Sequence, residues 1–151
     1  MADEITVRRA VEDDIKALAA LEKECFSENW SEKGIADSME LVYTEFVVAV
    51  FEERVVGYIS VYCSVDEGEI MNVTVTESMR RKGVAVKMFD MLFDILKERG
   101  IQKVFLDVRV SNEPAMSLYE KLGFERVGKR PAFYRKPRED AYIYRLDIRR
   151  N

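Results

Sequence analysis

The strongest chemical pattern in the sequence is a run of three cations and a glycine, Arg80-Arg81-Lys82-Gly83, directly before the best amphipathic helical pattern of the chain. Glycine allows an anion to approach the main chain, and the free N–H groups at a helix N-terminus attract negative charge. The pattern therefore predicts a phosphate-binding loop. From residue types alone the ligand could be almost any phosphate compound, and a solvated basic loop is the structural alternative.

The chain contains no histidine. This excludes Ser/His and Cys/His dyads and His-ligated metals, so proton transfer must use carboxylate, tyrosine, amine or water. The two cysteines, Cys25 and Cys63, lie in apolar segments and lack a C-x-x-C spacing, which favours buried free thiols. Neither has an activating neighbour in the sequence, so we expect no covalent enzyme intermediate and no metal site.

Length and composition restrict the class of protein. The 151 residues, of which 48% are hydrophobic and 34% charged, are typical of a single soluble domain that spans residues 1–151. No apolar run approaches the roughly 20 residues of a membrane span. Asp3 and Glu4 stand where a signal peptide would carry basic residues, which predicts a cytoplasmic protein. The net charge of −4 argues against direct nucleic-acid binding.

The spacing of apolar residues predicts the elements that must position these groups. Strands are expected at residues 5–7, 46–51, 55–64, 69–75, 104–108, 124–127 and 141–148, and helices at residues 12–26, 83–99 and 113–122, with a short helix after Ser31. The resulting order is β-α-α-β-β-β-α-β-α-β-β. It requires an α/β (α+β mixed) fold with a mixed sheet and helices on both faces, which is neither a Rossmann fold nor a barrel.

The basic loop, Arg80-Arg81-Lys82-Gly83-Val84-Ala85, resembles the R/Q-x-x-G-x-G/A signature by which GNAT acetyltransferases hold the pyrophosphate of coenzyme A. It follows Ile70-Met71-Asn72-Val73-Thr74-Val75, which is similar to the bulged fourth strand of that superfamily. The resemblance extends over nearly the whole chain and is closest to the ribosomal-protein-alanine acetyltransferase (RimI) family. Further stretches that carry it are Phe26-Ser27-Glu28-Asn29-Trp30-Ser31, Leu106-Asp107-Val108-Arg109-Val110-Ser111-Asn112, Leu118-Tyr119-Glu120-Lys121-Leu122-Gly123-Phe124, and Tyr134 with Glu139-Asp140-Ala141.

The resemblance implies a GNAT fold, with a mostly antiparallel sheet of about seven strands, and acetyl-coenzyme A as co-substrate. It also implies a set of cofactor-binding residues. Backbone groups of Val73, Thr74 and Val75 would contact the acetyl-pantetheine arm. The pyrophosphate would be surrounded by Arg81, Lys82, Gly83, Val84, Ala85 and Val86, and Asn112 would bind the cofactor with its side chain.

Two side chains take the catalytic roles that the resemblance implies. Tyr119 falls where the family has the tyrosine that protonates the departing thiolate, although its place in the apolar helical stripe of residues 115–122 also suits a core residue. Asp107 stands where the family has a glutamate as general base. Because one methylene is missing, Asp107 could require a bridging water, and Glu69 is a second candidate base. Either acid could instead be a charge at the edge of the sheet.

The expected function is transfer of an acetyl group to the α-amine of a protein N-terminus, which in the RimI family is the N-terminal alanine of a small-subunit ribosomal protein. Trp30, Phe133 and Tyr134 are candidates for lining the peptide groove. Deprotonation at pH 7 costs about 1.4 kcal/mol for an α-amine and about 4.6 kcal/mol for lysine, so a distant carboxylate suits an α-amine better. The alternatives are acetylation of a lysine or a small amine, and a non-catalytic acyl-coenzyme A-binding module, which the shortened Asp107 would favour.

Overall fold

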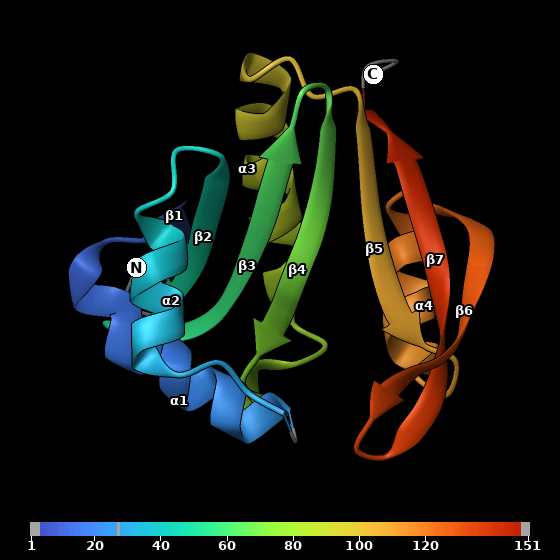
Figure 1. The fold of residues 1–151 in the computed structure, drawn as a ribbon. Helices are drawn as coiled ribbons and strands as arrows, with labels where there is room; N and C mark the ends of the chain where they lie inside the picture. Colours follow the sequence, from blue (N-terminus) through green and yellow to red (C-terminus); the bar gives the residue numbers. More distant parts are fainter. Residues whose placement is uncertain (1–3, 27, 149–151) are drawn as a thin grey trace.

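The fold is that of a computed structural model, in which residues 4–26 and 28–148 are described (Figure 1). In chain order the elements are β1 (Thr6–Arg9), the 3-10 turn η1 (Glu12–Asp14), α1 (Ile15–Cys25), α2 (Glu32–Met39), β2 (Thr44–Phe51), β3 (Arg54–Ser64), β4 (Glu67–Val75), the 3-10 turn η2 (Glu77–Met79), α3 (Val84–Glu98), β5 (Lys103–Arg109), α4 (Glu113–Lys121), β6 (Glu125–Arg135) and β7 (Arg138–Asp147). The order of strands and α-helices is the one that the sequence predicted.

The seven strands form one sheet in the order β1-β2-β3-β4-β5-β7-β6. All neighbouring strands are antiparallel except β4 and β5, which run parallel. Parallel neighbours cannot be joined by a tight turn, and α3 provides the crossover between them (Figure 1). The predicted mixed, mostly antiparallel sheet is therefore confirmed.

Helices cover both faces of the sheet, and each face has its own apolar core. In Figure 1, α1 and α2 lie in front of the sheet, where Leu18, Ile35 and Tyr58 are fully buried. Helices α3 and α4 lie behind it, and their larger core includes Phe89 and Tyr119. Because both faces are packed, the central strands form a rigid support for a site. None of the helices in the described residues has the length and apolarity needed to cross a membrane.

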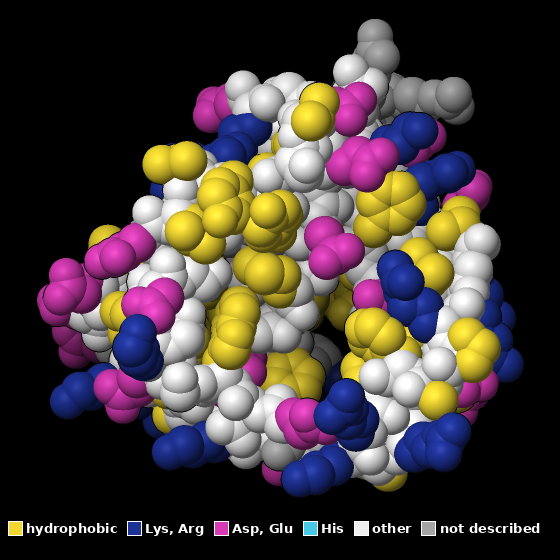
Figure 2. All heavy atoms as spheres, viewed as in Figure 1, with side chains coloured by type: hydrophobic (Ala, Val, Ile, Leu, Met, Phe, Trp, Pro, Cys, Tyr) yellow, Lys and Arg dark blue, Asp and Glu magenta, His cyan; other side chains and the backbone are white. Residues whose placement is uncertain are grey.

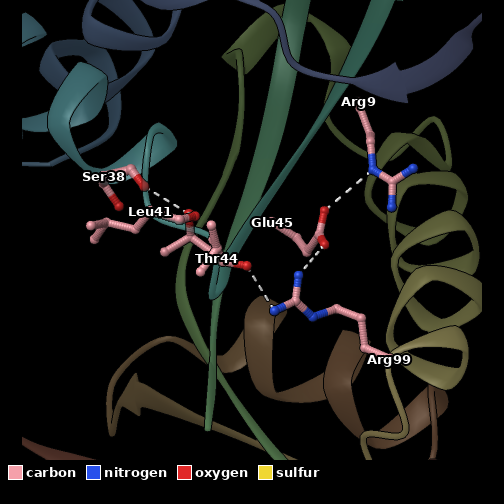
Figure 3. A network of polar contacts seen from close by, with 7 residues as sticks. Arg9, Ser38, Leu41, Thr44, Glu45 and Arg99 are labelled. Carbon is pink, nitrogen blue, oxygen red and sulfur yellow. Dashed lines mark hydrogen bonds and ion pairs between the residues drawn. The ribbon is translucent and has the colours of Figure 1, made fainter.

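A polar network fixes the C-terminal end of α3. Glu45, at the start of β2, accepts hydrogen bonds from Arg99 at 2.6 Å and from Arg9 at 3.3 Å (Figure 3). Arg99 is the C-cap residue of α3 and also donates to the carbonyl of Val42 at 2.9 Å. The network ties this end of the helix to β1 and β2, and it thereby helps to orient the opposite, N-terminal end of α3.

The structure corrects the last hairpin of the sequence-based prediction. Short strands were expected at residues 124–127 and 141–148, whereas β6 and β7 form a longer hairpin with two register shifts, one of them between Arg130 and Tyr134. Almost all side chains of β6 are exposed, so the strand lacks the apolar alternation by which a strand is recognised. The irregular stretch is a bulge, which re-aims side chains next to the cleft described below.

Candidate active site

A cleft opens where the two parallel strands separate. In the described part of the chain, β4 and β5 pair at three positions, from Glu67↔Lys103 to Glu69↔Phe105, and diverge toward their carboxyl ends. The space between them is a cavity of about 560 Å³, visible as the hollow between the two halves of the molecule in Figure 2. Of the residues singled out in the sequence, Val73, Asp107, Asn112, Tyr119, Phe133 and Tyr134 line it.

One wall of the cleft is β4, which carries the predicted bulge. Ser60 on β3 pairs with Asn72, but the next residue of β3 pairs with Ile70, so Met71 is the extra residue. Beyond the bulge, Val73 and Val75 pack against the core beneath α3. Because their side chains pack against the core, a bound molecule would contact the backbone of the strand.

Thr74, between these two valines, is 2% exposed. By the alternation of a strand its side chain faces the opposite layer from Val73 and Val75. A contact between Thr74 and a pantetheine arm would thus also have to use main-chain atoms, which is how the resemblance assigned it.

The basic loop has the conformation that an anion site needs. Gly83 is the N-cap of α3 with φ 78°, and its helix end receives no hydrogen bond from a capping side chain. A Cβ atom built on Gly83 would meet nothing within 4 Å, so the main chain is open to a ligand. Arg81, with φ 64°, and Lys82 are exposed beside it. The helix dipole, the N–H groups and the two cations fit a pyrophosphate.

Residues 81–86 are not part of the cleft lining; they lie where α3 begins, after the carboxyl end of β4 (Figure 1). Val84 is buried and anchors the helix in the core, Ala85 is half-buried and Val86 is 40% exposed. A ligand that uses both the loop and the cleft must therefore be extended, with its phosphates at one end.

Tyr119 belongs both to the core and to the cleft. Its ring centroid lies 5.8 Å from that of Phe124 and 6.1 Å from that of Phe89, and the residue is 7% exposed, yet it lines the cavity. Burial raises the pKa of the Tyr119 phenol above its usual range, and the nearby Tyr134 raises it further. The phenol is therefore neutral at physiological pH and can donate a proton to an anion in the cleft.

Asp107, on β5, reaches the cleft from the opposite strand. Its Oδ1 accepts a hydrogen bond from Nε of Arg130 at 3.1 Å, and its side chain is 21% exposed. Tyr134 also lines the cleft. Burial, first, and the charge of Asp107, second, raise the pKa of Tyr134 to about 12. Glu69, the second candidate base, is exposed and does not line the cavity. Of the two candidates, only Asp107 faces the cleft.

Asn112 is the N-cap residue of α4. Its Oδ1 accepts a hydrogen bond from the N–H of Ala115 at 3.2 Å, as the sequence indicated, and the residue also lines the cleft. Since capping occupies the oxygen, the amide nitrogen is the atom that remains to donate to a ligand.

The predicted groove aromatics and the two cysteines do not all lie at the cleft. Phe133 and Tyr134 line the cleft, but Trp30 packs on Phe46 in the core beneath α1 and α2, with ring centroids 6.2 Å apart. Cys63 is a buried free thiol, as predicted, whereas Cys25 is only half-buried and lines the cleft. Burial raises the pKa of Cys25 despite Arg80 at 3.6 Å, so this thiol is not activated as a nucleophile.

Sequence reasoning missed a carboxylate beside the cleft. Glu22 is buried in α1 and bonds to Tyr58 and Asn72. The signal was present, because Glu22 follows Leu18 by four residues within the apolar stripe of its helix, where a charge is out of place. Glu28 lines the cleft as a further acid, and no pattern in the sequence distinguished it from the other acids of the chain.

Comparisons with known proteins agree with this geometry. The model of the acetyltransferase (GNAT) family matches residues 15–124. An N-alpha-acetyltransferase of Saccharolobus solfataricus is 30% identical, over 93% of this chain and 91% of that protein. The ribosomal protein bS18-alanine N-acetyltransferase of Escherichia coli K12 is 31% identical, over 89% of this chain and 92% of that protein.

A solved structure extends the similarity to three dimensions. The crystal structure of the ribosomal-protein-S18-alanine N-acetyltransferase from Escherichia coli has a TM-score of 0.87 to this chain at 28% identity, covering 96% of this chain and 94% of that one. With a seven-stranded sheet that splays at β4 and β5 and a family match over most of its length, the chain belongs to the GNAT family and is an acetyl-coenzyme A-dependent N-acetyltransferase.

Proposed function

We propose that this protein transfers the acetyl group of acetyl-coenzyme A to the α-amine of a protein N-terminus. The observation that carries the proposal is that one cleft is lined by Val73 of β4 together with Asp107, Asn112 and Tyr119. Relatives of about the same length that are 30% and 31% identical are named for N-alpha and alanine N-acetylation, which supports this class of acceptor.

Acetyl-coenzyme A brings an activated thioester, whose carbonyl an amine can attack directly. The protein has to hold and orient it. The N–H groups at the start of α3, with Arg81 and Lys82, bind the pyrophosphate, and the amide nitrogen of Asn112 donates to the cofactor. Main-chain groups of residues 73–75 align the pantetheine arm along the splayed edge of β4.

Proton transfer is assigned to two side chains that line the cleft, Asp107 and Tyr119. Asp107 takes the proton of the incoming α-amine, through a water molecule because its side chain is short. Tyr119, which burial keeps protonated, donates its proton to the departing thiolate. Neither step passes through an enzyme-bound acetyl group, because burial raises the pKa of the Cys25 thiol.

We further propose that the acceptor is the N-terminal alanine of a small-subunit ribosomal protein. This finer assignment is supported by the 31% identity and the TM-score of 0.87 to Escherichia coli proteins of that name. It is also supported by the lower proton cost of an α-amine, about 3 kcal/mol below that of lysine at pH 7.

The test is a panel of acceptors with one acetyl donor. A short peptide with a free N-terminal alanine should react at least about tenfold faster than the same peptide with a blocked N-terminus and a free lysine. Mass spectrometry locates the acetyl group. Preference for the lysine peptide or for a polyamine would contradict the assignment of an N-terminal acceptor. Coenzyme A binding without turnover of any amine would identify a non-catalytic binding module.

A further inference from the structure

A buried carboxylate beside the cleft has no part in the chemistry above. Glu22, in α1, is 2% exposed. Its Oε2 accepts hydrogen bonds from the hydroxyl of Tyr58 at 2.6 Å and from Nδ2 of Asn72 at 2.9 Å, and its Oε1 accepts one from the main-chain N–H of Trp30 at 3.0 Å. All three donors are neutral, so this buried acid is held by hydrogen bonds without a cation among these partners.

Stability does not explain this arrangement. Burial raises the pKa of Glu22, although the hydrogen bonds from Tyr58 and Trp30 act in the opposite direction. A raised pKa means that the ionised carboxylate is less favourable in the folded protein than in the unfolded chain. A neutral side chain of similar volume would avoid that cost.

A second buried acid of the same layer provides the contrast. Asp14, 6% exposed, accepts hydrogen bonds from the guanidinium of Arg8 at 2.8 and 3.0 Å and from the N–H of Val11 at 2.8 Å. These bonds, that of Arg8 first, lower the pKa of Asp14, so its charge stabilises the fold. Asp14 does not line the cleft between β4 and β5.

Two partners of Glu22 belong to segments that line the cleft on its β4 side. Asn72 directly follows the bulge of β4, lines the cavity, and precedes Val73, where the pantetheine contact is expected. Trp30 belongs to the stretch after α1, which begins with the cleft-lining residue Phe26. One carboxylate therefore links the strand that would hold the acetyl donor to the cleft-lining segment that follows α1.

We propose that Glu22 is a positioning residue for acetyl transfer, which fixes the donor strand β4 relative to the cleft-lining segment after α1 through Asn72 and the N–H of Trp30. It acts through these groups and does not itself touch the substrates. The inference rests on the proposed chemistry of this cleft but not on the identity of the accepting amine.

Glu22→Gln is the informative change, because an amide cannot accept hydrogen bonds at both ends. If its oxygen accepts from Tyr58 and Asn72, its NH2 group faces the N–H of Trp30; in the reverse orientation it faces the NH2 group of Asn72. Tyr58→Phe is the milder variant. It removes one donor and keeps the ring that stacks on Phe46 with centroids 6.1 Å apart.

The experiment compares Glu22→Gln and Tyr58→Phe with the matched control Asp14→Asn, using the best acceptor from the panel. Glu22→Gln should lower kcat about tenfold to 100-fold, the scale of a displacement of about 1 Å, while coenzyme A affinity by calorimetry stays within about twofold. Trp30 is the only tryptophan, so its fluorescence should change in Glu22→Gln and report the released stretch independently of activity. Asp14→Asn should lose thermal stability and keep the wild-type kcat.

Two results would overturn the proposal. One is a wild-type kcat in folded Glu22→Gln and Tyr58→Phe proteins; the other is a loss of kcat in all three variants that simply follows their loss of stability. If Glu22→Gln does not fold, Tyr58→Phe decides alone, since it leaves the carboxylate in place. Failure of the wild-type protein to acetylate any amine would instead overturn the proposed function, and that result is separate because it needs no variant.

Discussion

The Nε atom of Arg130 lies 3.1 Å from Oδ1 of Asp107, so the proposed general base is one half of an ion pair across β5, β7 and β6. Arg130 stands at the start of the irregular stretch of β6, and its guanidinium lies beside the cleft-lining residue Asp107. The pair fixes the rotamer of a side chain that is one methylene shorter than the family's glutamate. The need for the carboxylate and the need for the ion pair can be tested separately, because each depends on a different residue of the pair.

Asp107→Ala should slow acetylation of an alanine peptide at pH 7, and the loss should shrink as the pH rises above the α-amine pKa of about 8, because the amine then arrives unprotonated. Rates measured from pH 6 to 9.5 test this. Arg130→Met removes the ion pair and keeps the acid, so its kcat should fall less. Equal losses in both variants at every pH would assign Asp107 a structural role in place of a catalytic one.

Tyr119→Phe should lower kcat by about 10²-fold to 10⁴-fold, as expected for loss of a general acid, with little change in coenzyme A affinity. The ring remains to pack on Phe89 and Phe124, so the fold should persist. Tyr144→Phe is the matched control, because its ring lies 6.3 Å from that of Tyr119 in the same cluster while its hydroxyl donates to Glu120 outside the cleft lining. Steady-state kinetics should show a near wild-type kcat for the control, and equal losses in the two proteins would make Tyr119 a core residue only.

Gly83→Ala should weaken coenzyme A binding, because a methyl group would stand where the main chain is open to the ligand. The substitution also costs about 1 to 2 kcal/mol of folding free energy, since φ is positive at this residue. Gly100→Ala carries the same cost at φ 79° and likewise meets nothing within 4 Å, but it lies at the other end of α3. Urea unfolding should give similar losses for both variants, while calorimetry should show weaker binding for Gly83→Ala alone.

The stability of the protein should depend on pH through Glu22 with a sign opposite to that of most acids. Because its folded pKa is raised, Glu22 binds more protons in the folded than in the unfolded state between pH about 4.5 and its folded pKa. Its contribution to the free energy of unfolding is therefore lost as the pH rises through that window. Tyr58, which faces it, and Cys25, which affects Tyr58, both titrate at higher pH and do not interfere.

Urea unfolding of the wild type and Glu22→Gln from pH 4 to 8 measures this effect. The free energy of unfolding of the wild type, minus that of Glu22→Gln, should decrease as the pH rises and then level off. Asp14→Asn should behave in the opposite way, since the folded pKa of Asp14 is lowered and its stabilisation is lost as the pH falls. A flat difference for Glu22→Gln would show that the ionised carboxylate costs no stability.

The sequence by itself determined the local features, because they depend on residues close together in the chain. Gly83 before an amphipathic helix, Asn112 before a Pro-containing helix start and the β-branched runs each specify their element through nearest-neighbour physics. The order of these elements then allowed few arrangements of the sheet, since parallel neighbours need a crossover helix. Family resemblance supplied the candidate roles of Asp107 and Tyr119, which the residue pattern alone left open.

Only the tertiary structure decided which side chains meet. The three-residue pairing of β4 with β5 and the bulge at Met71 open the cleft, and neither is visible in apolar spacing. Arg130 reaches Asp107 across 23 residues, and Glu22 reaches Asn72 across 50. Such contacts depend on how separate elements pack, whereas a sequence pattern reports only the face on which a residue lies. For that reason the sequence contained a signal for Glu22, a charge within an apolar stripe, which sequence reasoning missed, while the partners of Glu22 became known only from the fold.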